Sequence, residues 1–261
     1  SNLPVILEKT AASIPFNDSA ANILTAIAGV NKYTGEITLT GTPTAVELNA
    51  IAKGTTGKVT ATLDPATTID AVTVAALKDV KTTDNITFKP TGPGLAVSGN
   101  SELTALINLK KLLPNANFTN IGTIGGTHSD VALIKSAQKL AADDADVTIT
   151  GQISAADANA IAKATDGALT ATINSGSVAA TLKALADVNK TDDDITFTTT
   201  DKSVNARDLV ELNKKIQTPA KFDVTSIETI TENAKDVGVD AVKVTDALDI
   251  ADVAVKITGA I

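Results

Sequence analysis

Two groups of clustered aspartates are the residues whose type and spacing best suit cation binding. The groups are Asp192, Asp193 and Asp194, and Asp143, Asp144 and Asp146. Calcium takes about six to eight oxygen ligands, so carboxylates gathered near turns could bind it. The related segment 81–85 carries fewer acids, which favours solvated turns, helix caps or strand starts over a repeated metal site. Calcium therefore stays a candidate cofactor, and no residue is assigned as a metal ligand.

The single histidine, His128, is the only residue that could act as the base of a Ser-His-Asp triad. It lies in a glycine-rich stretch beside Ser129 and Asp130, but triad members must converge in space, which adjacent residues rarely do. Carboxylate pairs for glycoside hydrolysis need a cleft, and aromatic residues that could stack on a sugar make up 2% of the chain. We expect an exposed loop histidine and no enzyme activity, with no catalytic or cofactor-binding residue assigned.

The composition narrows the class of protein further. The chain has 261 residues and no cysteine, methionine or tryptophan. It therefore has no disulfide and no thiolate metal site, and its one histidine cannot supply a multi-histidine zinc site. At 43% hydrophobic the chain can fold, but its core must consist of Ala, Val, Ile and Leu. Each small side chain buries little area, so such a core needs a regular, repetitive arrangement.

The balance of acidic and basic residues limits the classes of partner that we expect. The 22 basic and 30 acidic residues give a net charge of −8, which repels a phosphate backbone. No basic stripe with interleaved aromatic residues is present, so we expect no nucleic-acid partner. Lys or Asp interrupts the longest apolar runs, so we expect no membrane span.

The chain repeats itself. Residues 37–63 and 147–173 are identical at 14 of 27 positions, without a gap, at an offset of 110. The match continues between residues 77–88 and 185–197, and Phe118 and Phe222 follow in step. After an insert at 89–101, residues 106–112 match 210–216 at an offset of 104. Such agreement indicates a duplicated unit of domain size.

Alternating residues predict strands in both repeats. In the second repeat the strands are expected at Val147–Thr150, Leu169–Ile173, Ile195–Thr198 and Phe222–Val224. Side chains alternate across a strand, so one face is aliphatic and the other carries threonine, which favours extended backbone and tolerates water. The threonines expected on the second face are Thr38, Thr40, Thr60, Thr62, Thr87, Thr148, Thr150, Thr170, Thr172, Thr196 and Thr198.

Helical spacing appears between these strands. Thr44-x-x-Glu47 and Ser154-x-x-Asp157 are capping-box-like starts at equivalent positions. The residues expected on the buried helix faces are Leu48, Ile51, Ala52, Ala158, Ile161, Ala162, Val178, Leu182, Leu185, Leu209, Leu212 and Ile216. Gly57 and Gly167 fall where a helix gives way to a strand, so we expect them to end the helices in a left-handed conformation.

The strand–helix alternation with short connections predicts an α/β fold with parallel strands and helices on one face. We expect an α/β solenoid like a leucine-rich-repeat horseshoe, with two tandem α+β domains as the alternative. The expected organisation is an N-terminal helical cap (1–35, with a helix over 11–30), repeat unit one (36–145), repeat unit two (146–240) and the start of a third unit (241–261). In the last segment Val242, Val244, Val253, Val255 and Ile257 alternate, so we expect the natural chain to continue past residue 261.

The phrases ISAADANAIAKATDGALTATI (153–173) and DVNKTDDDITFT (187–198) resemble repeats of bacterial surface-layer (S-layer) proteins and of large type I-secreted adhesins. The resemblance covers most of residues 37–261. The glycine-rich nonapeptide calcium repeat of secreted toxins is absent, and residues 125–130 match it only in part. The resemblance implies a secreted structural or adhesive protein of the bacterial cell surface. It also implies self-association or contact with neighbouring copies, and a cell-envelope glycan as a candidate partner.

A second interpretation is a ligand-binding module. Its threonine-rich sheet face would bind a glycan or a protein, with ice as the weakest candidate because a twisted sheet spoils lattice matching.

Overall fold

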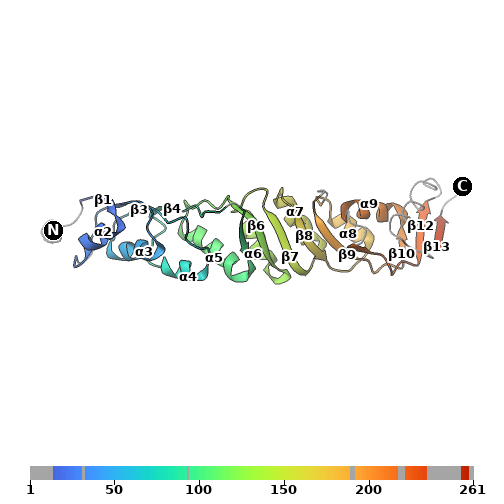
Figure 1. Cartoon of the computed structure of the whole chain (residues 1–261). Helices are drawn as coiled ribbons and strands as arrows, with labels where there is room; N and C mark the ends of the chain where they lie inside the picture. The colour runs from blue at the N-terminus through green and yellow to red at the C-terminus, as the bar shows by residue number, and fades with distance from the viewer. Residues whose placement is uncertain are drawn as a thin grey trace. The chain divides into compact units, whose positions relative to one another are not determined.

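Strands and helices mostly alternate along the chain in the computed structural model (Figure 1). The structure describes residues 14–30, 33–92, 94–188, 192–216, 221–233 and 254–258. The strand pairs with a described register are parallel, which confirms the predicted α/β class of alternating strand–helix units. The chain divides into two compact units, residues 1–123 with 139–142, and residues 124–138 with 143–261.

The first unit contains a parallel sheet of order β1-β2-β3-β4. Its described strands are β1 (Phe16–Ser19), β2 (Ile37–Thr40), β3 (Val59–Thr62), β4 (Asn85–Thr87) and β5 (Leu95–Ser98). Its described helices are α2 (Ala20–Ile27), α3 (Ala45–Gly54), α4 (Ala71–Ala76) and α5 (Gly99–Leu112).

The second unit contains neighbouring strands in the order β11-β9-β8-β7-β6 and a further sheet of order β10-β12-β13. Its strands are β7 (Asp146–Ile153), β8 (Leu169–Ile173), β9 (Asp194–Thr198), β10 (Ser203–Asn205), β11 (Phe222–Asp223), β12 (Thr229–Asn233) and β13 (Ala254–Thr258). Its helices are η1 (His128–Asp130), α6 (Val131–Gln138), α7 (Ala155–Ala164), α8 (Val178–Ala184) and α9 (Ala206–Ile216). The division between the units falls within β6 (Ile121–Thr127).

The strands bury one face and leave the other wet, as the alternation predicts. Ile37 and Leu39 of β2 are buried, as are Leu169, Ala171 and Ile173 of β8. The threonines expected on the opposite face are exposed or half-buried: Thr38, Thr40, Thr60, Thr62, Thr87, Thr148, Thr150, Thr170, Thr172, Thr196 and Thr198. Aliphatic residues thus make up most of the core, which also contains Tyr33, Phe88, Phe118 and Phe197, and threonine hydroxyls lie on the other face of these strands.

The helix starts follow the predicted caps. The Thr44 hydroxyl accepts the backbone N–H of Glu47 at 3.3 Å, and the Glu47 carboxylate accepts the backbone N–H of Thr44 at 2.9 Å. Ser154 accepts the backbone N–H of Asp157 at 3.0 Å. The residues on the predicted helix faces are buried, except Leu182, which is half-buried while its neighbour Thr181 is buried.

Gly57 and Gly167 follow helices, but the reason predicted for them is wrong. Neither has a left-handed backbone, and the helices end through extended threonines, Thr55 and Thr165. A Cβ on Gly57 would lie 2.0 Å from the carbonyl oxygen of Gly35, and one on Gly167 would lie 2.4 Å from that of Asp144. Glycine is needed because two backbone segments approach too closely for any side chain.

The same hydrogen bonds recur in the two repeats. The buried Thr165 hydroxyl donates to the carbonyl of Asp143 at 3.1 Å and accepts the N–H of Gly167 at 2.9 Å. The buried Thr55 hydroxyl donates to the carbonyl of Tyr33 at 3.0 Å and accepts the N–H of Gly57 at 2.9 Å. Each threonine therefore ties a helix end to the loop about one strand–helix unit earlier.

Aromatic pairs also recur. Phe88 and Phe118 lie with ring centroids 5.8 Å apart, and their counterparts Phe197 and Phe222 lie 5.7 Å apart. Such pairs stabilise a core beyond the area that they bury. The sequence repeat is thus a structural repeat at the level of individual contacts.

The two ends of the chain differ from expectation or lie partly outside the described residues. A helix is expected over residues 11–30; within the described part, 14–30, the helix is α2 alone, and residues 16–19 form β1, which pairs with β2. Val242, Val244 and Val253 lie outside the described residues. Val255 and Ile257 lie in β13, which pairs in parallel with β12.

Candidate functional site

Hydroxyl side chains line up across the first sheet. The strand register places Thr38 opposite Thr60, and Thr60 opposite Asn85. In the next row Thr62 lies opposite Thr87, and their hydroxyl oxygens are hydrogen-bonded at 2.9 Å. This face therefore carries rows of hydroxyl groups that can donate and accept hydrogen bonds.

The second unit has a similar row of threonines, which ends in a charged residue. Thr148 lies opposite Thr170, and Thr170 lies opposite Asp194. Asp194 forms an ion pair with Lys221 on the neighbouring segment. The corresponding position in the first repeat is Asn85, whose side chain accepts a hydrogen bond from Asn115 at 2.8 Å.

A bulge interrupts the threonine row of the second repeat. The register of β7 shifts between Thr148 and Gln152, so Gln152 rather than Thr150 lies opposite Thr172. Gly151 allows the bulge, because its φ of 88° is a left-handed conformation. The Thr150 hydroxyl donates instead to the carbonyl of Gly126 at 3.2 Å. The hydroxyl array is therefore not a regular lattice.

The aspartates of residues 192–194 have three different environments. Asp193 is buried, and its carboxylate accepts the backbone N–H of Leu169 at 2.9 Å. Its counterpart Asp84 accepts the N–H of Val59 at the same distance. Asp194 is half-buried in its ion pair, and Asp192 is exposed. The repeated aspartate therefore holds the start of the preceding strand.

The second aspartate group also acts through single contacts. Asp146 accepts the N–H of Ala168 at 2.9 Å, while Asp143 and Asp144 are exposed. Within the part of the chain that the structure describes, no three His, Cys, Asp or Glu side chains are placed to hold a metal ion.

His128 is exposed, as predicted, at the start of η1. Asp130 is buried, and its carboxylate accepts the backbone N–H of Thr127 at 2.9 Å and the Thr127 hydroxyl at 2.8 Å. The Thr127 hydroxyl is also bonded to the Ser129 hydroxyl at 2.8 Å. The Ser129 and Asp130 side chains therefore meet at Thr127 and build a capped turn.

Hydrogen bonds lower the pKa of several carboxyls. The Asp157 carboxyl has a lowered pKa because Lys135 and Ser154 donate to it, the Lys135 contact being 2.5 Å long. Backbone and hydroxyl donors of Thr44 lower the pKa of Glu47 in the same way. Such groups stay ionised at neutral pH, which suits helix capping rather than general acid chemistry.

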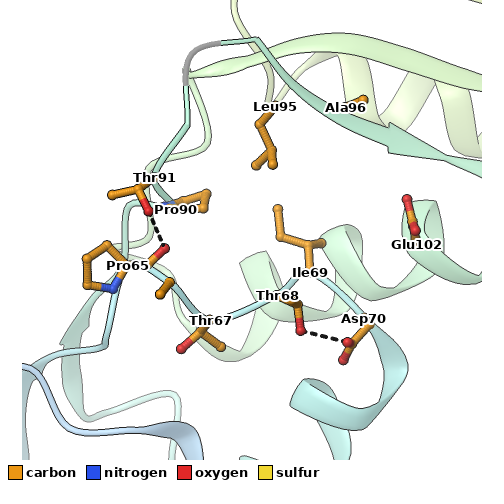
Figure 2. A pocket seen from close by; sticks show the side chains of 11 residues that line it. Pro65, Thr67, Thr68, Ile69, Asp70, Pro90, Thr91, Leu95, Ala96 and Glu102 are labelled. Carbon is orange, nitrogen blue, oxygen red and sulfur yellow. Dashed lines mark hydrogen bonds between the residues drawn. The ribbon is translucent and has the colours of Figure 1, made fainter.

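A pocket of about 500 Å³ lies in the first unit between residues 65–70 and 90–96. Figure 2 shows Ile69 and Leu95 facing each other across it, with Pro65 and Pro90 at one side and the carboxylates of Asp70 and Glu102 at the other. Its volume is in the range of small-molecule sites. The sequence prediction did not include this pocket, although one of its walls lies in the insert at 89–101.

No family model, curated protein or solved structure matches the chain. Among the described residues, no helix combines the length and apolar character that a bilayer crossing requires.

Proposed function

We propose that the chain is a structural or adhesive repeat segment of a secreted bacterial cell-surface protein of the S-layer type. In this proposal the strand–helix units stack as an α/β solenoid, without catalysis. The assembly presents an extended acidic surface to neighbouring copies or to a cell-envelope glycan.

The observation that carries the proposal is the recurrence of contacts between successive strand–helix units. Asn49 of α3 holds Asp79 after α4, and Asn159 of α7 holds Asp187 after α8, by the same pair of hydrogen bonds. The partners lie 30 and 28 positions apart, which is about one unit. Units that bond to the next unit in the same way can be added along a chain, as in repeat proteins.

The surface chemistry supports a role in association. The net charge is −8, so copies repel one another unless their carboxylates are neutralised or bridged. The exposed aspartates at 143, 144 and 192 are free of the strand-start contacts made by Asp84 and Asp193. We therefore propose that calcium, bridging carboxylates between copies, promotes assembly.

Sedimentation velocity at rising protein concentration, with calcium or with a chelator, tests self-association. The proposal expects larger species with calcium and their loss with the chelator. A variant with Asp143, Asp144 and Asp192 changed to Asn should form fewer of these larger species at the same calcium concentration, because it lacks carboxylates that calcium would bridge. A chain that stays monomeric at every concentration in both conditions would overturn the self-association part.

The alternative is a ligand-binding module that uses the threonine face for a glycan or a protein. The hydroxyl pair of Thr62 and Thr87 favours it, because aligned hydroxyls can both donate and accept. Glycan and protein arrays probed with the chain and with a Thr62→Val, Thr87→Val variant test this function. Binding of one ligand class by a monomer, lost in the variant, would favour the module over the structural segment.

A further inference from the structure

The pocket in the first unit lies where the first repeat has extra residues. Leu77 follows Leu63 by 14 positions, whereas the equivalent Leu185 follows Ile173 by 12. Val97 follows Phe88 by 9 positions, whereas Val204 follows Phe197 by 7. Leu106 of α5, the helix that carries Glu102, follows Val97 by 9 positions, whereas Leu209 of α9 follows Val204 by 5. All three lengthened segments contribute to the pocket lining.

In the second repeat, hydrogen bonds join the corresponding segments. Gly176 and Thr199 form a parallel bridge, and the Thr199 hydroxyl donates to the carbonyl of Gly176 at 3.2 Å. The Asp201 carboxylate then accepts the N–H of Val178 at the start of α8, at 2.8 Å. In the first repeat the equivalent contact is made by Thr91, whose N–H and hydroxyl both donate to the carbonyl of Pro65. Past this contact, residues 67–70 on one side and Leu95 and Ala96 on the other line the pocket.

The polar lining of the pocket presents acceptors. The Thr68 hydroxyl donates to Asp70 at 2.7 Å, and the Thr91 hydroxyl donates to the Pro65 carbonyl at 3.2 Å, so the hydrogens of both hydroxyls are engaged. Pro65 and Pro90 have no N–H. Figure 2 shows the Thr67 hydroxyl turned away from the space between Ile69 and Leu95.

The two carboxylates keep acceptor positions for a ligand. Asp70 accepts the backbone N–H of Thr73 at 2.7 Å besides the Thr68 hydroxyl, and these bonds keep its pKa below the ordinary value. Glu102 accepts the backbone N–H of Ser98 at 2.8 Å. A carboxylate has about four acceptor sites, so each retains free ones. A pocket with apolar walls, acceptors and negative charge selects a cation that carries N–H donors.

We propose that this pocket binds a primary ammonium group on a short aliphatic stem, as in a lysine side chain or a small alkylamine. The stem lies between Ile69 and Leu95, and the ammonium donates to Glu102, while the Asp70 carboxylate adds negative charge to the same side of the pocket. The net charge of −8 attracts such a cation. A hydrated metal ion would meet the apolar side chains of Ile69 and Leu95 instead of oxygen ligands there. The chemistry of this site does not depend on the surface-protein role proposed above.

Amide chemical-shift titrations of the full chain by NMR test the site. n-Butylammonium should shift the amides of Ile69, Asp70, Leu95, Ala96 and Glu102 with a dissociation constant of about 1 mM, as befits a small fragment. The amides of residues 174–178 and 199–202 in the second repeat should stay unshifted, which gives a control within the same molecule. n-Butanol has the same stem without charge and should not saturate the pocket. Acetyl-lysine amide, compared with n-butylammonium, distinguishes a peptide lysine from a free amine as the better ligand.

Charge variants locate the ammonium. Glu102→Gln keeps an acceptor for Ser98 and should weaken n-butylammonium binding about tenfold, the effect of losing one charged hydrogen bond. Glu36→Gln, an exposed carboxylate of the same unit that does not line the pocket, should leave binding unchanged. Absence of saturable shifts in the parent chain would overturn the proposal. Equal binding of n-butanol, or calcium shifting the same amides more strongly, would overturn it too, whatever the folding of the variants.

Discussion

Asn159 and Asp187 hold each other through two hydrogen bonds across 28 positions of chain. The Asn159 side-chain amide donates to the Asp187 carboxylate at 2.9 Å, and the backbone N–H of Asp187 donates to the Asn159 side-chain oxygen at 2.6 Å. Asn49 and Asp79 make the same two bonds, at 3.0 and 2.7 Å. Two hydrogen bonds thus join α7, which carries Asn159, to the loop after α8, which carries Asp187. The pair therefore fixes the spacing between successive strand–helix units.

Asn159→Ala should therefore destabilise the protein by about 1–3 kcal/mol, because the Asp187 N–H and carboxylate both lose a half-buried partner. Asn174→Ala is the matched control, since Asn174 is exposed and its described bond is a backbone one. Urea unfolding with a double-mutant cycle to Asp187→Ala measures the coupling. Additive effects of the two substitutions would contradict this role for the pair.

Thr165→Val should cost about 1–3 kcal/mol, although its shape is almost unchanged. The buried hydroxyl serves the carbonyl of Asp143 and the N–H of Gly167, and valine leaves both without that partner. Thr170→Val, on the exposed face of β8, should change the free energy of unfolding by less than about 0.5 kcal/mol. Equal melting temperatures for the two variants would show that the buried hydroxyl is not a structural link.

Gly167→Ala should destabilise the protein by about 3 kcal/mol, the upper end of the range typical of overpacking. The reason is that the new Cβ would lie 2.4 Å from the backbone oxygen of Asp144. Gly176→Ala is the control, since its Cβ would meet no atom closer than 3.9 Å and its backbone is not left-handed. Thermal unfolding compares them. A Gly167 variant as stable as the Gly176 variant would mean that the two backbones do not approach closely.

Local patterns made much of the fold predictable. The period-two alternation of Leu169, Ala171 and Ile173 with threonine identifies the strand and its faces, because burial of one face requires that period. The caps at Thr44 and Ser154 depend on residues three positions apart, so they too are readable. Both signals need no knowledge of what packs against the element.

Features that depend on distant neighbours were predicted incorrectly or missed. The role of Gly167 comes from the Asp144 carbonyl, which lies far back in the sequence. Sequence identity aligns residues 106–112 with 210–216, at an offset of 104. The pattern of buried residues instead aligns Leu106 and Leu109 with Leu209 and Leu212, at an offset of 103. The two offsets differ because packing, rather than residue type, decides which helix positions are equivalent. The pocket had a signal in the insert at 89–101, yet its other wall, at 65–70, is brought there only by the fold.

Low pH should destabilise the protein partly through Asp157. Lys135 and Ser154 lower its pKa in the folded state, so the unfolded chain binds its proton more readily. The stabilisation from Asp157 is complete above the ordinary value of 3.8 and is lost as the pH falls through the lower folded value. Melting temperatures of the parent chain and of Asp157→Asn, measured from neutral to acid pH, should differ most near neutrality and converge below about pH 4.

The effect should shrink in high salt, because the Asp157 and Lys135 side chains are 38% and 37% exposed. A difference between the two proteins that grows as the pH falls would contradict a lowered pKa at Asp157, because the variant lacks the group that must take up the proton.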